Sequence, residues 1–129
     1  MASMLQFKIN QIQEESDSWK RFLAFMGEEN IYLKNRLSLA AKSGSEKDSL
    51  INLENFLDRS VHHDEAIRLM KQDLSEFDKL IVRETYEDGH VSKKLEQELR
   101  HNRVNVKKLA EHFEQLKAEF NSYLQENTL

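Results

Sequence analysis

Residues 95–123, LEQELRHNRVNVKKLAEHFEQLKAEFNSY, decide the fold. The apolar residues of this stretch fall alternately three and four positions apart, and Asn102 is the polar interruption. The apolar members are Leu95, Leu99, Val106, Leu109, Phe113, Leu116, Phe120 and Tyr123. This heptad spacing is typical of a helix that lies lengthwise against other helices. The sequence therefore predicts a helix over about residues 91–127.

The same spacing continues through the other two thirds of the chain. In the first third it runs through Leu5, Ile9, Ile12, Ser16, Trp19, Leu23, Met26, Asn30, Leu33, Leu37 and Ala40. In the middle third it runs through Leu53, Phe56, Ser60, His63, Ile67, Met70, Leu74, Phe77 and Ile81. These series predict helices over about residues 4–42 and 46–87. Because Leu5, Phe7 and Ile9 also alternate, an extended arm over residues 4–16 is the alternative.

Two short connections predict how the helices are arranged. Gly44 and Gly89 can each end a helix, Ser45 can cap the second helix, and Ser92 or Asp88 can cap the third. Short connections between long helices make neighbours antiparallel. The chain has no proline and three glycines, which favours an all-α fold. We expect one domain over residues 1–129, an antiparallel up-down-up three-helix bundle with long coiled-coil-like helices. A larger bundle of two chains is the alternative.

Composition excludes several classes of function. The net charge of −4 argues against a general nucleic-acid binder. A chain without cysteine has no disulfide, no thiolate nucleophile and no Cys-ligated metal. No apolar run is long enough to span a bilayer, and the first residues lack a signal-peptide core. No catalytic motif or phosphate-binding glycine loop is present. We expect a cytoplasmic, non-enzymatic protein without a cofactor or a membrane span.

Polar residues inside the heptad series are candidates for setting the helix register. These residues are Asn30, Ser60, His63 and Asn102. Folding at the two glycines places Asn30 near Ser60 and places Asn102 near Phe77. Polar groups at core positions fix register and orientation at some loss of stability. We expect Asn30 to bond across to the second helix, and His63 to be neutral and hydrogen-bonded.

Histidines allow a second interpretation, a metal site. His62 and His63 lie on the second helix, and His112 is expected about one turn away on the third. Imidazole ligands on facing helices are how bundle metal sites are built. Adjacent residues on a helix point about 100° apart, however, so His62 and His63 do not face the same way. The sequence therefore favours register setting over metal binding.

The first helix carries apolar residues beside its heptad series. They are Phe22, Phe25, Tyr32 and Leu39, with Ile31 nearby, and the second helix adds Leu50, Leu57 and Val61. One interpretation is a wide core that buries both sets. The other is an open surface that binds a partner.

On the third helix, Arg100, Arg103 and Lys107 are expected to pair with acidic residues of the second, namely Asp73, Glu76 and Asp78.

The function expected from these features is a helical-bundle interaction or scaffold module. It would self-associate as a homo-oligomer or bind a helical protein partner. Two alternatives are a metal-binding bundle that uses His62 or His63 with His112, and a carrier that holds an apolar ligand between the helices. The polar residues Asn30 and His63 in the series do not suit the carrier.

Overall fold

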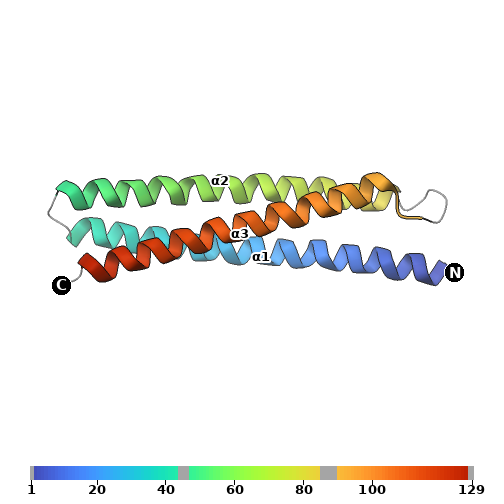
Figure 1. Cartoon of the computed structure of the whole chain (residues 1–129), viewed down its shortest axis with the longest axis horizontal. Coiled ribbons are helices and arrows are strands. Elements are labelled where there is room, and N and C mark those ends of the chain that lie inside the picture. The colour runs from blue at the N-terminus through green and yellow to red at the C-terminus, as the bar shows by residue number, and fades with distance from the viewer. Residues whose placement is uncertain (1, 44–46, 85–89, 128–129) are drawn as a thin grey trace.

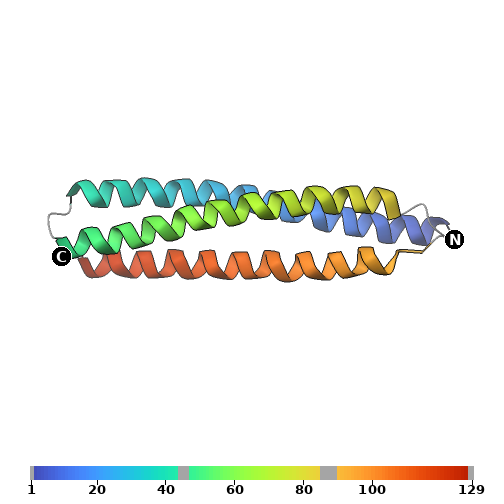
Figure 2. The same cartoon turned by 90° about the horizontal axis from the view of Figure 1, so that it is seen from above.

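The computed structural model describes residues 2–43, 47–84 and 90–127. They form three helices, α1 (Ala2–Ser43), α2 (Lys47–Glu84) and α3 (Lys93–Asn127). The helices lie side by side along one axis, with α1 and α3 running in one direction and α2 in the other (Figures 1 and 2). The predicted all-α, antiparallel up-down-up three-helix bundle is confirmed.

Helix α1 is continuous from Ala2, so the extended arm is wrong. Leu5 and Ile9 are half-buried, whereas Phe7 is exposed. Burial every four residues follows the helical period, and a strand would have placed all three side chains on one face. Of the residues predicted at the connections, Gly44, Ser45, Asp88 and Gly89 lie outside the described part of the chain.

Ser92 caps α3, as predicted. The backbone N–H of Leu95 donates to Oγ of Ser92 over 3.1 Å, and the N–H of Glu96 donates to the Ser92 carbonyl over 3.1 Å. The bond from Leu95 pairs one of the four N–H groups that a helix start leaves unbonded, and the bond from Glu96 is the first regular bond of the helix. Glu96 also places a negative charge in the first turn, where the helix dipole favours it.

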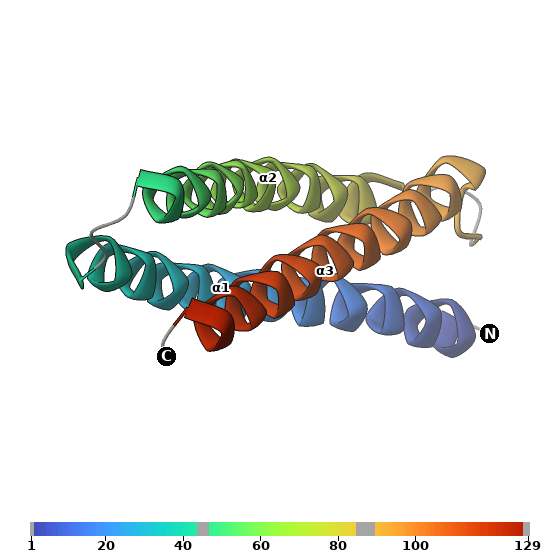
Figure 3. The same ribbon diagram turned by 60° about the vertical axis from the view of Figure 1, so that its left-hand side comes forward.

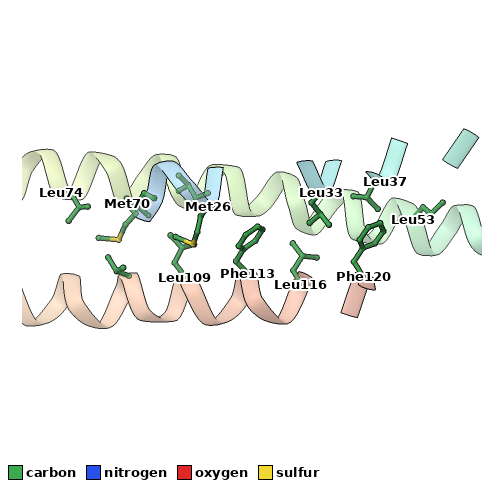
Figure 4. Close-up of a cluster of buried hydrophobic side chains, with 13 residues drawn as sticks. Met26, Leu33, Leu37, Leu53, Met70, Leu74, Leu109, Phe113, Leu116 and Phe120 are labelled. Carbon is green, nitrogen blue, oxygen red and sulfur yellow. The ribbon is translucent and has the colours of Figure 1, made fainter. Parts of the chain in front are cut away.

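The heptad residues form the core, in two clusters that Trp19 connects. The larger cluster includes Leu74, Phe113 and Phe120 and extends from the middle of the bundle toward the α1–α2 connection (Figure 4). The smaller cluster lies toward the α2–α3 connection and consists of Ile12, Phe77, Leu80, Ile81, Leu95 and Leu99. Trp19 packs against both clusters. Burial of these side chains is the main force that holds the helices together.

Ion pairs align α1 with α3 at one constant offset. The partners of each pair are 88 residues apart in the sequence. The pairs are Lys8–Glu96 at 3.3 Å, Glu15–Arg103 at 2.6 Å and Glu29–Lys117 at 2.9 Å. A constant offset means that the two helices keep one register over three heptads, from Lys8 to Glu29 of α1. Figure 3 shows α3 inclined across α1, as heptad packing requires.

The prediction that the basic residues of α3 pair with α2 is wrong for the two arginines. Arg103 pairs with Glu15 of α1, and Arg100 lies 4.0 Å from Glu96 of its own helix. Asp78 of α2 instead pairs with Lys20 of α1. The reason is geometric. The flank of the α3 seam that carries Arg103 faces α1, and the short connections do not determine which flank faces which helix.

Candidate functional site

An exposed apolar stripe follows the outside of α1. We call Phe22, Phe25, Tyr32 and Leu39 the α1 stripe. Their exposed fractions are 38%, 55%, 65% and 66%. Ile31, on the other flank of α1, is 56% exposed. Because these side chains stay outside the bundle, the wide-core interpretation is wrong for this chain.

Exposed apolar residues of α2 lie at the same end of the bundle. They are Leu50, Ile51, Leu57 and Val61. Together with the α1 stripe and Ile31 they belong to the parts of α1 and α2 that adjoin the α1–α2 connection, residues 22–39 and 50–61. The other large exposed apolar residues, Met4, Phe7, Leu69, Val82 and Val104, are spread over all three helices. Gathered apolar surface is more informative than scattered residues, because single exposed apolar side chains are common.

Arg36 forms one border of the α1 stripe. Its guanidinium lies 5.7 Å from the centre of the Tyr32 ring and 5.2 Å from that of Phe120. It also donates to Oδ1 of Asn121 over 2.9 Å, across a groove of about 390 Å³ between α1 and α3. The cation over the ring limits how far Tyr32 can move. Arg36 therefore contacts one aromatic ring of the stripe from the side of α3.

A buried polar layer joins α1 to α2 at Asn30. Nδ2 of Asn30 donates to the Ser60 carbonyl over 2.8 Å and to Oδ1 of Asp64 over 2.7 Å. Oγ of Ser60 donates back to Oδ1 of Asn30 over 2.6 Å. Lys34 pairs with the second oxygen of Asp64. The predicted bond from Asn30 to the second helix is confirmed, and both Asn30 and Ser60 are fully buried.

A second layer repeats this arrangement, and the sequence analysis missed it. Ser16 is fully buried, and its Oγ donates to Oδ1 of Asp78 over 2.8 Å, while Lys20 pairs with Oδ2. Asn30, Lys34 and Asp64 occupy the same relative positions two heptads away, since each lies 14 residues from its counterpart. We call the two sets the polar clamps. The signal was present in the sequence as a serine within the heptad series, followed four residues later by lysine.

His63 is buried between α2 and α3. Its ring stacks on Phe113 with the centroids 4.3 Å apart and the planes 3° apart. Burial lowers the pKa of His63 to about 4, Asp64 acts against this shift, and His112 adds to it. A pKa this low agrees with the predicted neutral state. The predicted hydrogen bonding is wrong at Nε2, which is buried without a partner in the described part of the chain.

The three histidines proposed for a metal line one surface pocket of about 350 Å³ between α2 and α3. His62 is exposed, and its Nδ1 lies 2.7 Å from the Asp58 carbonyl, while His63 is held against Phe113. The predicted gathering of His62, His63 and His112 is therefore correct. Among the described residues, however, no three acidic or histidine side chains are placed to hold a metal ion.

Asn102 lies beside Phe77, as predicted, where a pocket of about 280 Å³ opens between α2 and α3. Asn102 is 2% exposed, yet its Nδ2 has no hydrogen-bond partner among the residues the structure describes. A buried donor without a partner costs about 1–3 kcal/mol. Asn102 thus differs from Asn30, although both occupy polar positions in their heptad series.

No protein-family model matches the chain, and neither the curated proteins nor the solved structures compared with it gave a match. None of the helices, over the residues described, combines the length and the apolar character that crossing a membrane requires.

Proposed function

We propose that this chain is a non-enzymatic interaction module, a helical scaffold that binds another helical surface through the α1 stripe. The partner is a protein helix, either of a second copy or of a different protein. The observation that carries the proposal is the exposure of Phe25, Tyr32 and Leu39, each more than half exposed on an otherwise charged bundle. We place the module in the cytoplasm, consistent with a chain that has no cysteine.

The spacing of the stripe supports a helical partner. Phe25, Tyr32 and Leu39 follow one another at seven-residue intervals, the period with which one helix contacts another along its length. Aromatic residues are enriched at the centres of protein interfaces, where they bring large area at low entropic cost. A partner helix laid along α1 would cover all three side chains.

Photo-crosslinking tests the proposal. A photoreactive phenylalanine analogue replaces Tyr32 in cells, and we expect a discrete crosslinked species. Phe25→Asp on the same chain should remove that species, because a carboxylate at the centre of an apolar contact is costly to bury. Leu69→Asp is the matched control, since Leu69 is 48% exposed but lies away from the stripe. Crosslinking that survives Phe25→Asp would contradict the proposal.

The alternatives give a different result in a second experiment. Native mass spectrometry of protein purified without chelator reads bound mass and chain number together. A metal-binding bundle predicts the added mass of a metal ion that His112→Ala removes, and an apolar-ligand carrier predicts a co-purifying organic mass. An interaction module predicts the bare chain mass or its multiples. It also predicts that His63→Ala leaves the crosslink of the preceding experiment intact.

A further inference from the structure

The outer face of α1 is symmetric about Glu28. Phe25 and Ile31 lie three residues from it on either side, and Ala24 and Tyr32 lie four. Residues three and four apart share a face of a helix, so these four side chains surround Glu28. All five residues are exposed. We call Ala24, Phe25, Ile31 and Tyr32 the outer patch.

The same segment of α1 is apolar on its inner face. Leu23, Met26, Leu33 and Leu37 are 3% exposed or less and belong to the core. Exposed apolar side chains on a segment whose inner face is already in the core indicate an interaction surface. Within the bundle α2 and α3 cover only the inner face of α1. The outer patch is therefore expected to lie against a second layer of helix.

The charges along the outer ridge of α1 indicate what covers it. The ridge consists of residues at seven-residue intervals, Glu14, Arg21, Glu28, Asn35 and Lys42. Glu14 and Lys42 lie at equal distances, 14 residues, before and after Glu28. A second α1 running antiparallel, with a two-fold axis at Glu28, brings Glu14 of each copy level with Lys42 of the other. A parallel second α1 would place like charges together all along the ridge.

We propose that the outer patch binds a second copy of this chain, with α1 antiparallel to α1 around a two-fold axis at Glu28. Phe25 of each copy then lies level with Ile31 of the other, and Ala24 with Tyr32. A two-fold interface uses the same patch on both chains, and the symmetry of the patch about Glu28 fits that requirement. This inference rests on the proposed function and specifies its partner.

The size of the outer patch, taken together with Phe22 and Leu39 of the α1 stripe, predicts a reversible dimer. The exposed parts of Phe22, Phe25, Ile31, Tyr32 and Leu39 amount to on the order of 500 Å² of apolar surface per chain. That is near the top of the roughly 300–600 Å² of the largest patch on a typical monomer. It is below the roughly 800 Å² per partner of a standard stable interface. We therefore expect a dissociation constant in the micromolar range, about 1–100 μM.

Sedimentation equilibrium of the full chain, from about 1 to 200 μM, tests this inference. The wild-type chain should shift from monomer to dimer over that range. Phe25→Asp should remove the dimer, and Leu69→Asp should keep it, with circular dichroism showing that both variants remain helical. Glu28→Gln should tighten the dimer, because two carboxylates otherwise meet at the axis.

Charge reversal tests the antiparallel register. Glu14→Lys and Lys42→Glu should each weaken the dimer by roughly two- to tenfold through the two symmetry-related pairs, and the double variant should restore it. A double variant weakened by the sum of the two single effects would overturn the proposed geometry. A chain that stays monomeric throughout would overturn the inference alone if position 32 still crosslinks to a different protein. A chain that neither forms a dimer nor crosslinks from position 32 would overturn the proposed function as well.

Discussion

The two buried asparagines, Asn30 and Asn102, differ in their hydrogen bonding. Asn30 has three hydrogen bonds to α2, whereas Nδ2 of Asn102 has none from the described residues. Asn30→Leu should lower the free energy of unfolding by about 2–3 kcal/mol, because the buried Ser60 hydroxyl and the Asp64 carboxylate lose their bonds to Asn30. Asn102→Leu should raise it by about 1 kcal/mol, because it removes an unpaired donor and adds apolar contact with Phe77.

Urea unfolding followed by circular dichroism measures both asparagine variants in one series. Asn30→Ala and Asn102→Ala are matched controls that remove the amide without adding a branched side chain. Two leucine variants that change stability in the same direction would show that the hydrogen bonds seen at Asn30 do not distinguish the two positions.

His63 makes stability depend on pH. The pKa of its imidazole is about 4 in the folded chain, below its ordinary 6.5, because the ring is buried. As the pH falls below 6.5 the unfolded chain takes up a proton that the folded chain does not. His63 therefore costs the folded state no stability above pH 6.5. Between pH 6.5 and about 4 the free energy of unfolding falls as the pH falls. At about pH 5 this one group should cost about 2 kcal/mol relative to pH 7.

His63→Leu should remove this part of the pH dependence, measured as the free energy of unfolding at several values between pH 7 and 4. His62→Leu is the control, since His62 is adjacent but exposed. Carboxylates contribute equally to the acid loss of both variants, so the difference between them isolates His63. Equal slopes for the two variants would contradict a buried, neutral His63.

Gly27 lies in the middle of α1 without a structural need for glycine. The helix continues through it, and a Cβ added there would have no atom within 4 Å. The close helix contact that a central glycine can indicate is therefore absent at Gly27. Gly27→Ala should raise the free energy of unfolding by about 0.5–1 kcal/mol, by reducing the entropy of the unfolded chain. Thermal unfolding with Ala24→Gly as the reverse control measures it, and a fall in the melting temperature would contradict it.

The heptad pattern made the helices predictable, because it reports which face of each helix is buried. It also placed Asn30 near Ser60 and Asn102 near Phe77, since the short connections fix the levels of neighbouring helices. The pattern does not report which flank of α3 faces α1, and the pairing of Arg103 was therefore mistaken. Nor does it report whether apolar residues outside the series are covered. The exposure of Phe25 and Tyr32 required the structure.

The polar clamps explain why α1 and α2 pair in one register. They recur after two heptads, at Ser16 and at Asn30, while Leu23 occupies the equivalent place between them. A slip of one heptad in either direction would set Asp64 against Leu23 or Leu37, neither of which offers a matching polar group. Apolar contacts alone tolerate such a slip, because every heptad supplies similar side chains. The clamps therefore add selectivity between registers more than they add stability.

At the scale of the whole molecule, α3 is held differently from the α1–α2 hairpin. Both polar clamps join α1 to α2, whereas the unpaired buried atoms belong to Asn102 of α3 and to His63, which packs on α3. The ion pairs between α1 and α3 are partly exposed, and such pairs contribute little. Amide hydrogen exchange should therefore be faster across the middle of α3 than across the middles of α1 and α2. Uniform protection of all three helices would contradict this difference.

The odd number of helices also has a mechanical consequence. The start of α1 and the end of α3 lie at opposite ends of the rod (Figure 1). Tension applied between them pulls α1 and α3 past α2 along the rod axis. The force therefore acts in shear on all the contacts between the packed helices at once. It does not separate the helices one turn at a time from an end. Helices of 35–42 residues would share that load over about 50–60 Å.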